Sequence, residues 1–409
     1  MEQITAVVIG AGSRGSIYAG YAKEHPEELK IVAIAEPRDE RLHMLAEDVG
    51  VSVENRFSDW QDLLDQPKMA DCAFICTLDD DHIAPALKAM ELGYDLLLEK
   101  PMSNEEAECR TIVETAHKLN CKLAVCHVLR YTPFYMTLKA LIDQGEIGEV
   151  TTINQIENVG YWHQAHSFVR GNWRNSKETS PMLLQKSCHD MDIILWLMGK
   201  NCLRVHSFGS LRHFTADQAP AGAPQCCLDG CPHEEACPYY APKLYMDMER
   251  TGWPIDVITT DFSLEGRRKA LEEGPYGRCV YHCDNDVVDR QVVNLEFEGG
   301  AVATFTMTGL SADFSRQLKI FGTQGQITAD MGTKEIILHR FGEERRSISV
   351  DMGLEASGHG GGDFGIMRDF LSALRDDGES RTSAAVSLQS HLICFAAERS
   401  RKENIVVTL

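Results

Sequence analysis

The N-terminal third of the chain alternates between short apolar runs and longer amphipathic stretches. The apolar runs are typical of buried strands and lie at 4–9, 30–35, 71–77, 94–98 and 122–126. Helical spacing of apolar residues fills the intervals at 16–24, 38–49, 60–64, 82–92 and 105–119. Strands that alternate with helices predict a mostly parallel, doubly wound α/β sheet, and ligands bind such sheets at the carboxyl ends of the strands.

The pattern changes after about residue 128. Apolar and polar residues alternate over 291–297 and 301–307 around a turn, which predicts an antiparallel hairpin. One-sided alternation suits a sheet whose second face is covered by helices, a partner subunit or water. Further strands are predicted at 317–321, 326–329 and 335–340, and a helix at 364–374. We therefore predict two domains, 1–128 and 129–409, with an insert at about 210–283.

Composition narrows the functional classes. The 409 residues include 40 Lys and Arg against 61 Asp and Glu, a net charge of −21, so nucleic acid and anionic membranes are poor partners. No apolar stretch approaches the roughly 20 residues of a membrane span, and no signal-peptide pattern opens the chain. Cysteines outside 226–283 sit singly in apolar or helical contexts, as buried thiols of a reducing compartment do. We therefore expect a cytoplasmic protein.

A glycine-rich turn joins the first predicted strand to the first helix. Its sequence is Gly10-Ala11-Gly12-Ser13-Arg14-Gly15, which has the spacing of a dinucleotide-binding turn. In such a turn Gly10 permits the tight bend, Gly12 lets the backbone approach a pyrophosphate, and Gly15 allows the helix to pack closely on the strand. The N-terminus of the helix then faces the phosphates. This setting between strand and helix predicts a nucleotide site.

Acidic Glu36 ends the second strand, where a carboxylate can bind the ribose hydroxyls of NAD and repel the 2′-phosphate of NADP. Arg38 could accept that phosphate, so we predict NAD while NADP stays open. The next strands end at 77–82 and at Glu99-Lys100-Pro101, on the same edge of the sheet. The candidate cofactor-binding residues are Gly10, Gly12, Ser13, Arg14, Gly15, Glu36, Arg38, Thr77, Leu78, His82, Glu99 and Lys100.

Together these motifs resemble the glucose–fructose oxidoreductase / inositol dehydrogenase / MocA (Gfo/Idh/MocA) family. Further matching segments are Arg130-Tyr131-Thr132-Pro133, Gly145-Glu146-Ile147-Gly148-Glu149-Val150, and His189 before the helix end Trp196-Leu197-Met198-Gly199. The resemblance covers the chain except about 210–280. It implies a Rossmann domain followed by an α/β domain with a large open, mainly antiparallel sheet, bound NAD(P), and chemistry on a sugar or cyclitol. It also implies a homo-oligomer, a dimer or tetramer, formed through the exposed sheet face.

The resemblance further implies that Lys100 touches both nicotinamide and substrate, and that the peptide bond before Pro101 is often cis. One departure stands out. The family usually has an acidic residue four positions before the histidine, but here that position is Gln185, followed by Lys186. This puts the usual Asp–His pair in doubt and indicates that Lys186 supplies charge to the site.

Hydride transfer from a secondary alcohol needs a base for the hydroxyl proton and a cation for the developing alkoxide. His189 has the natural pKa for the base, and Lys100 suits the cation, with the two roles exchangeable. With Lys186 these are the predicted catalytic residues. The alternatives are a core histidine that caps a helix and a surface lysine before a proline.

Aromatic and cationic residues interleave from 161 to 174, as a polyhydroxyl ligand requires for stacking and for donors. The alternative is ordinary packing and solvated arginines. His359 could also line the site, but a plain linker is the favoured interpretation of 358–363. The candidate substrate residues are Arg130, Tyr131, His163, Trp173 and Arg174, with Trp162, His166 and Arg170 also considered.

Six of the 14 cysteines lie between 226 and 283. Cys227, Cys231 and Cys237, with Cys279 or Cys283 as a fourth ligand, are spaced like a structural metal knuckle in Pro- and Gly-rich sequence. Four thiolates suit Zn²⁺ in a closed tetrahedral site. An iron–sulfur cluster is the less favoured metal alternative, and free or disulfide-bonded thiols remain open. The predicted set is Cys227, Cys231, Cys237 and Cys279.

These observations favour an NAD-dependent oxidoreductase that acts on a secondary alcohol of a sugar, sugar derivative or cyclitol. The first alternative is an NAD-dependent glycosidase that works by oxidation, elimination and re-reduction, which the change at Gln185 and Lys186 keeps open. The second is a non-catalytic NAD-binding sensor, against which the joint presence of Lys100 and His189 argues. The sequence does not identify the substrate or the carbon that reacts.

Overall fold

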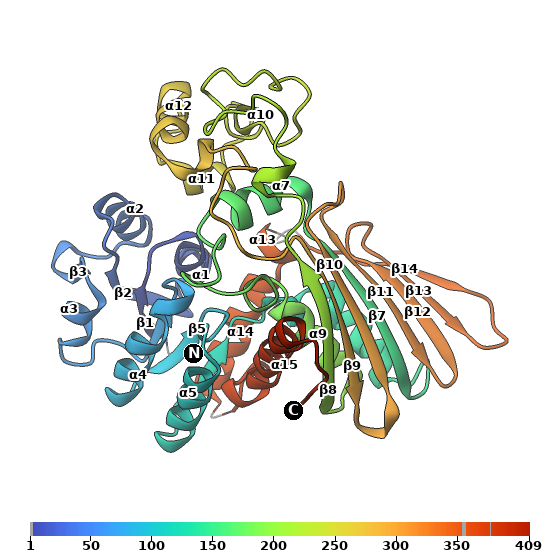
Figure 1. Cartoon of the computed structure of the whole chain (residues 1–409). Helices are drawn as coiled ribbons and strands as arrows, with labels where there is room; N and C mark the ends of the chain where they lie inside the picture. The colour runs from blue at the N-terminus through green and yellow to red at the C-terminus, as the bar shows by residue number, and fades with distance from the viewer. Residues whose placement is uncertain (1–2, 354–356, 377) are drawn as a thin grey trace.

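The computed structural model describes residues 3–353, 357–376 and 378–409, and over these residues the chain forms two β-sheets with helices around them (Figure 1). The N-terminal sheet contains β1 (Ile4–Ile9), β2 (Leu29–Ala35), β3 (Arg56–Phe57), β4 (Cys72–Ile75), β5 (Asp95–Leu98) and β6 (Leu123–Val125). Its helices are α1 (Ser13–Glu24), α2 (Asp39–Val49), α3 (Trp60–Leu64), α4 (Ile83–Glu91) and α5 (Glu106–Lys118).

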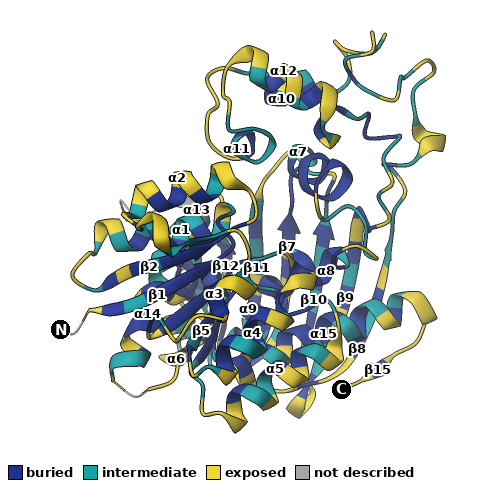
Figure 2. Cartoon of the chain, turned by 90° about the vertical axis from the view of Figure 1, so that its left-hand side faces the viewer, coloured by how far each residue is buried: buried dark blue, intermediate teal, exposed yellow. Residues whose placement is uncertain are grey.

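The N-terminal sheet has the strand order β3-β2-β1-β4-β5-β6, and every neighbouring pair is parallel. Its central strands are buried on both faces because helices cover both sides, as Figure 2 shows. The order reverses between β1 and β4, next to the glycine-rich turn. This is the doubly wound sheet that the sequence predicts, with the nucleotide site expected at that switch point.

The second sheet is built from strands that come later in the chain. They are β7 (Val150–Asn158), β8 (Cys202–Ser210), β9 (Arg290–Phe297), β10 (Val302–Thr308), β11 (Ser315–Gly322), β12 (Gly325–Asp330), β13 (Glu335–Arg340), β14 (Arg346–Ser349) and β15 (Val407–Thr408). Their order is β14-β13-β12-β11-β7-β10-β9-β8-β15, and pairing is antiparallel except between β7 and β10. The predicted hairpin is β9–β10.

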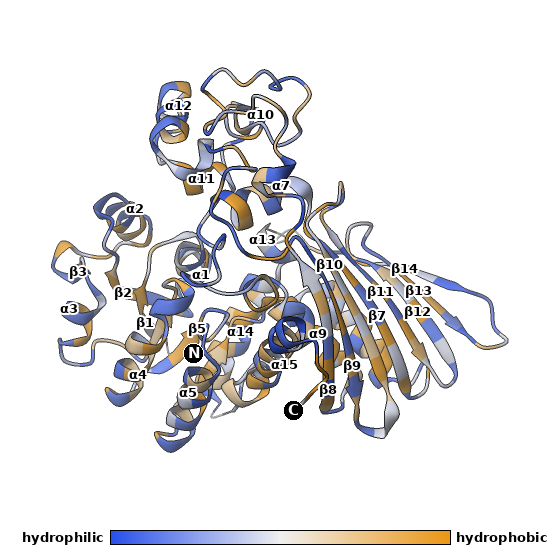
Figure 3. Cartoon of the chain, in the orientation of Figure 1, coloured by the Kyte–Doolittle hydropathy of each residue, from blue (hydrophilic) through white to orange (hydrophobic). Residues whose placement is uncertain are grey.

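Residues alternate between buried and more exposed along this C-terminal sheet, and Figure 3 shows apolar residues recurring along its strands. The buried face packs on helices that supply one large apolar core with it. These helices are α6 (Pro133–Asp143), α8 (Met182–Gln185), α9 (Cys188–Met198) and α15 (Ala384–Glu403). The opposite face therefore stays available to water or to a partner.

One C-terminal helix packs on the N-terminal sheet. In α14 (Gly362–Arg375) the buried residues Ile366, Met367 and Phe370 join the same core as Val8 and Phe74. The N-terminal unit therefore completes its core with residues from the far end of the chain. The boundary at residue 128 stays a prediction, because the two units share this helix.

The segment between β8 and β9 contains the predicted insert, with α10 (Ala241–Tyr245), α11 (Ile255–Ile258) and α12 (Leu264–Glu273). It has a small core of its own around Tyr245, Ile255 and Leu271. Arg41 on α2 donates to the carbonyl of Asp256 in the insert at 2.8 Å. The insert therefore reaches from the C-terminal domain to the N-terminal domain, above α2 in Figure 1. Among the described residues, no helix is both long and apolar enough to cross a membrane.

Candidate active site

The three glycines of the turn before α1 differ in how closely other atoms approach them. A side chain at Gly10 would meet the carbonyl oxygen of Cys76 at 2.5 Å, and one at Gly15 would meet the carbonyl of Gly10 at 2.0 Å. At Gly12 the nearest atom to an added Cβ is 3.9 Å away, on the Arg38 side chain. Two glycines thus serve close packing, while a side chain at Gly12 would have only ordinary van der Waals contact with Arg38. The backbone N–H groups at this helix start fit the phosphates of a dinucleotide.

Glu36 lies beside this turn at the end of β2. Its Oε2 accepts the Ala11 backbone N–H at 2.8 Å, and its Oε1 accepts Arg38 Nε at 2.5 Å. Burial raises the pKa of Glu36, but the hydrogen bond and charge of Arg38 outweigh burial, and the pKa is lowered overall. The carboxylate is therefore ionised, where it suits the ribose hydroxyls of NAD.

The guanidinium group of Arg14 is bonded to three side chains of the protein. Its Nε bonds Glu99 Oε1 at 2.9 Å, and its Nη2 bonds Asp363 at 2.5 Å and Tyr18 at 2.5 Å. The guanidinium therefore connects α1, the end of β5 and α14. The predicted role of Arg14 and Glu99 in binding the cofactor stays a prediction, and the geometry favours support of the turn.

His82 holds two site loops together. Its Nδ1 faces the carbonyl oxygen of Pro101 at 2.7 Å, and its Nε2 faces that of Thr77 at 3.2 Å. The peptide bond between Lys100 and Pro101 is cis, as the resemblance implies. The loop that contains Leu78 is thus attached to the turn that presents Lys100.

Lys100 and His189 come from the two different domains. Lys100 Nζ donates to the carbonyl oxygen of Gln185 at 2.6 Å, and Gln185 is the last residue of α8, which directly precedes α9 and its His189. His189 is 3% exposed, and neither ring nitrogen has a hydrogen-bond partner among the described residues. Burial, with the positive charge of Lys100, holds the pKa of His189 well below its usual value. The imidazole is therefore neutral and able to accept a proton.

Sequence reasoning missed a buried charge network next to Lys186. Lys186 Nζ lies 3.7 Å from Glu157 Oε1 on β7, and Arg316 Nε on β11 lies 2.6 Å from Glu157 Oε2 and 2.9 Å from Asp190. Burial lowers the pKa of Lys186 to about 8 and raises that of Glu157 to about 7. Glu157 thus supplies, from a neighbouring strand, a carboxylate where Gln185 has none. The sequence did not predict this role of Glu157, because a single acidic residue near the end of a strand has no distinguishing local pattern.

His359 lies in the site and not in a plain linker, which corrects the favoured interpretation of 358–363. It belongs to α13 (Ser357–Gly360), and its ring centre is 5.8 Å from that of His189. Its Nδ1 is 3.2 Å from Asp363, which also pairs with Arg14. The loop before α14 therefore adds a second histidine beside His189.

Three predicted substrate residues have their polar groups bonded to the protein. Arg130 forms a buried two-bond pair with Asp192, at 2.7 and 2.6 Å. The Tyr131 hydroxyl lies 2.9 Å from Asp369, and Arg174 Nε lies 2.8 Å from Asp284. Their predicted substrate contacts stay untested, and the geometry favours structural roles.

Aromatic rings also gather near Lys186. His163 packs against Trp162, Trp253 and Phe314 with ring centres 5.7, 4.9 and 5.2 Å away, and Lys186 Nζ lies 5.3 Å from the Phe314 ring. Trp253 belongs to the insert and was not predicted. Aromatic faces beside charged groups suit a ligand that has both C–H surfaces and hydroxyls.

Trp173 and Asp79 extend this wall toward the N-terminal domain. The indole Nε1 of Trp173 donates to Asp79 Oδ1 at 3.2 Å. Asp79 is buried, and burial raises its pKa although the charges of His82 and Lys100 oppose this. Asp79 therefore connects the predicted substrate wall with the loop that carries Lys100.

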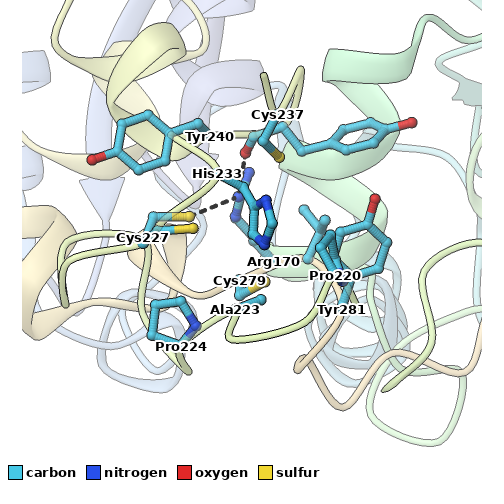
Figure 4. A pocket seen from close by; sticks show the side chains of 13 residues that line it. Arg170, Pro220, Ala223, Pro224, Cys227, His233, Cys237, Tyr240, Cys279 and Tyr281 are labelled. Carbon is cyan, nitrogen blue, oxygen red and sulfur yellow. Dashed lines mark hydrogen bonds between the residues drawn. The ribbon is translucent and has the colours of Figure 1, made fainter. Parts of the chain in front are cut away.

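The four predicted cysteines line one small cavity in the insert, with a volume of about 20 Å³ (Figure 4). Arg170 lines it too and donates to Cys227 Sγ at 3.7 Å, so this arginine faces the thiols. His166, considered as a substrate contact, bonds the Tyr245 hydroxyl at 2.7 Å inside the insert. Among the described residues, the one group of three or more potential metal ligands whose ligand atoms all lie within 4.8 Å of one another is His25, Glu27 and Glu28. No three of the thiols are that close.

Comparison with known proteins covers nearly the whole chain. Residues 4–127 match the family model for the NAD-binding Rossmann fold of the Gfo/Idh/MocA oxidoreductase family, and residues 139–409 match the model for its C-terminal alpha/beta domain. The putative oxidoreductase YteT of Bacillus subtilis is 26% identical, over 74% of this chain and 72% of its own length.

A 2,7-anhydro-N-acetylneuraminate hydratase of Mediterraneibacter gnavus is also 26% identical, over 49% of this chain and 50% of that relative. Among solved structures, levoglucosan dehydrogenase in complex with NADH and levoglucosan superposes with a TM-score of 0.75 at 19% identity, covering 100% of this chain and 99% of that one. That likeness confirms the fold. The chain is an NAD-binding oxidoreductase of the Gfo/Idh/MocA family.

Proposed function

We propose that the protein is an NAD-dependent dehydrogenase that transfers hydride between the nicotinamide and a secondary alcohol of a sugar, sugar derivative or cyclitol. The observation that carries the proposal is the buried His189, whose ring nitrogens have no partner among the described residues, next to the Lys100 turn. An unpartnered buried imidazole is costly unless a ligand completes its hydrogen bonds. A substrate hydroxyl at this position would do so.

The cofactor would lie along the carboxyl edge of the N-terminal sheet. The turn from Gly10 to Gly15 would hold the pyrophosphate, and Glu36 would accept the ribose hydroxyls. When bound, the nicotinamide supplies the hydride acceptor or donor. The ionised Glu36, already paired with Arg38, supports NAD over NADP, because a 2′-phosphate would meet a carboxylate at this place.

Proton transfer follows from the charges of the site. In alcohol oxidation the substrate hydroxyl gives its proton to the neutral His189 nitrogen. The Lys100 ammonium group stabilises the alkoxide that develops on the same oxygen. The pair of Lys186 and Glu157 binds neighbouring hydroxyls, one group as donor and the other as acceptor.

The substrate class rests on the wall beside these groups. Rings of His163, Trp162, Trp253 and Phe314 offer flat apolar faces within reach of the Lys186 charge. The C–H faces of a sugar or cyclitol stack on such rings while its hydroxyls bind charged groups. The solved levoglucosan dehydrogenase complex, which has the same fold, agrees with this class.

A second function is favoured by one observation. Glu157 and Lys186 form an acid–base pair beyond the base and cation that hydride transfer needs, and both have pKa values moved toward neutrality by burial. Such a pair could remove and return a carbon-bound proton in a redox-neutral elimination. The relative described as a hydratase lends support. A non-catalytic NAD sensor has no such support.

A panel of sugars, cyclitols and glycosides distinguishes these functions. NADH absorbance and released aglycone are followed together, with the wild-type chain and a Lys100→Met variant. Net NADH formation that the variant loses supports the dehydrogenase. Aglycone release without net NADH formation supports the redox-neutral reaction. If neither NADH nor aglycone is formed although the protein binds NADH, the result supports the non-catalytic NAD sensor.

Assembly and location complete the proposal. The face of the C-terminal sheet that its helices leave uncovered would pair copies of the chain into a dimer or tetramer. The cysteines outside 226–283 are mostly buried, which supports the interpretation of these residues as thiols of a reducing, cytoplasmic compartment. The predicted structural zinc remains one candidate for the cysteine cavity.

A further inference from the structure

One short segment of the insert connects the aromatic rings around His163 with the N-terminal domain. At the start of the segment, the ring of Trp253 lies 4.9 Å from that of His163. Three positions later in the sequence, the carbonyl oxygen of Asp256 accepts a hydrogen bond from Arg41 Nη2 on α2 at 2.8 Å. The segment 253–256 therefore reaches from the proposed substrate wall to the domain that binds the cofactor.

The insert contacts α2 at a second place. Thr260 Oγ1 donates to a carboxylate oxygen of Glu40, the residue before Arg41. Both contacts involve the first turn of α2, which begins shortly after Glu36 and Arg38. Figure 1 shows α11 of the insert above α2. The insert thus contacts the N-terminal domain next to the residues that we expect to bind the ribose of the cofactor.

The segment between the ring of Trp253 and the carbonyl of Asp256 is held firmly from inside the insert. Ile255 is fully buried in the small core of the insert. Arg267 on α12 is also fully buried, and its guanidinium donates to main-chain carbonyls on both sides of the segment. These are the carbonyls of Asp247 at 2.7 Å, Arg250 at 2.6 Å and Phe262 at 3.0 Å. Because charge-assisted bonds to the main chain oppose a change in its path, a displacement at Asp256 should also move Trp253.

Arg41 differs from an ordinary surface arginine. Its side chain is partly buried, and this burial lowers the pKa of its guanidinium. A partly desolvated guanidinium needs an acceptor, and the carbonyl of Asp256 in the other domain is one. The contact is therefore a defined bond between the domains and not a chance approach of two mobile surfaces.

We propose that Arg41 is a positioning residue for the substrate wall. It holds the insert against the N-terminal domain, so that Trp253 packs on His163 where the ring of a sugar or cyclitol would stack. This role rests on the proposed function, because the wall is taken as the surface that binds the substrate. The cofactor residues Glu36, Arg38 and the glycine-rich turn all belong to the N-terminal domain, so cofactor binding should not depend on this bond. Its loss should raise the substrate KM and leave kcat and NADH affinity nearly unchanged.

A double-mutant cycle tests whether Arg41 acts through Trp253. The wild type, Arg41→Ala, Trp253→Ala and the double variant are assayed with the substrate that the wild type converts fastest in the panel above. Arg41→Ala should raise KM about three- to tenfold, with kcat within about twofold of the wild type. In the Trp253→Ala background it should change KM by less than about twofold, because the ring that it positions is absent. Equal factors in both backgrounds would overturn the proposal, as would a wild-type KM in Arg41→Ala.

Two further variants separate this role from a general loss of stability. Arg41→Lys keeps a donor for the Asp256 carbonyl and should recover part of the lost substrate affinity. Arg110→Ala removes an exposed arginine on α5 that pairs with Glu106 of the same helix, and it should behave as the wild type does. If Arg41→Ala does not fold, Thr260→Val takes its place, because it removes the second contact between the insert and α2.

A fluorescence measurement tests the bond without any substrate. The emission of Trp253 is obtained as the difference between each chain and its Trp253→Phe counterpart. Trp253 is partly exposed and packs on His163, so acrylamide should quench it more strongly once Arg41→Ala releases the insert. Quenching in Arg110→Ala should equal that of the wild type. Unchanged quenching in Arg41→Ala would overturn the proposal and leave the dehydrogenase function standing, because the panel tests that function separately.

Discussion

His189 is set apart from an ordinary histidine by its surroundings. It is buried beside Lys100, within ring-contact distance of His127 and His359, at 5.7 and 5.8 Å. Desolvation and the nearby positive charge keep it neutral at physiological pH. A neutral imidazole without a hydrogen-bond partner can accept a proton. Burying it without a hydrogen bond also raises the free energy of the folded protein.

Replacing His189 by Asn should therefore remove the base without leaving a large hole. We expect kcat to fall by about 10² to 10⁴, the range for loss of a general base, while the affinity for NADH stays within a factor of two or so. His117→Asn, at an exposed position on α5, is the matched control and should behave as wild type. Steady-state kinetics and NADH fluorescence titration measure both effects. An unchanged kcat in the His189 variant would remove His189 from the mechanism.

The Lys186 and Glu157 pair predicts a narrow pH profile. A lysine whose pKa is lowered to about 8 loses its charge above that pH, and a glutamic acid whose pKa is raised to about 7 loses its carboxylate below that pH. The charged pair thus exists mainly between these values, which belong to the pair as a whole. We expect kcat/KM to be bell-shaped with its maximum near this interval.

Single substitutions identify the two limbs of that profile. Glu157→Gln should remove the fall of kcat/KM at acidic pH. Lys186→Met should remove its fall at basic pH and also lower its maximum value. Lys186→Arg keeps a positive charge to higher pH and should move the basic limb upward. A wild-type profile that is level from pH 6 to pH 9 would show that neither group controls the reaction.

At the scale of elements, the turn between β1 and α1 contains one glycine that we expect to matter for stability and another that we expect to matter for cofactor binding. Gly15 lies against the Gly10 carbonyl, whereas a Cβ at Gly12 would meet no atom closer than the Arg38 side chain at 3.9 Å. Gly15→Ala must push backbone aside and should lower the free energy of unfolding by about 2 kcal/mol or more. Gly12→Ala should unfold near the wild-type temperature but bind NADH at least about tenfold more weakly. Thermal melts measure the stability of both variants, and NADH titration measures their cofactor binding. If both variants melt and bind NADH like the wild type, the assigned roles of Gly12 and Gly15 are wrong.

The insert is the second element that links packing to function. Trp253→Ala removes one ring of the wall around His163 and should raise the substrate KM about tenfold or more, with NADH affinity unchanged. Phe262→Ala is a matched control, because this exposed ring lies in the same insert and is not one of the rings described around His163. A higher KM in both variants would indicate general loosening of the insert.

At the scale of the whole molecule, the outer face of the C-terminal sheet carries a row of apolar and small polar side chains. Register places Ile156, Thr306, Val292 and Phe208 side by side across β7, β10, β9 and β8. Phe208 is 57% exposed and Ile156 is 39% exposed. Such a row on an open sheet suits an interface between two copies of the chain.

Phe208→Asp tests that interface. It places a charge in the row on a protein whose net charge is already −21, so paired copies would repel one another. Sedimentation should show an oligomer for the wild type and a smaller species for the variant, with unchanged melting of the monomer. Asp at Val53, an exposed position in the N-terminal domain, should leave the mass unchanged. A monomeric wild type would exclude the oligomer.

Much of this architecture was readable from the sequence. The strand–helix alternation predicted the N-terminal sheet, and the alternation over 291–307 predicted the β9–β10 hairpin. The turn at Gly10 to Gly15 and the acid at Glu36 stood where expected. These features depend on neighbours a few residues apart, because helix periodicity, strand pleat and turn conformation are local properties.

The tertiary structure alone decided how the site is assembled. Arg14 pairs with Asp363, 349 residues away, and Glu157 meets Lys186 and Arg316 only because β7, β11 and the turn before α9 pack together. No local pattern marks such partners, since a single charged residue on a strand looks the same whether it faces solvent or a buried cation. The sequence determined the fold class and the cofactor turn, whereas the pairing of distant buried charges required the folded chain, because only burial makes those charges depend on one another.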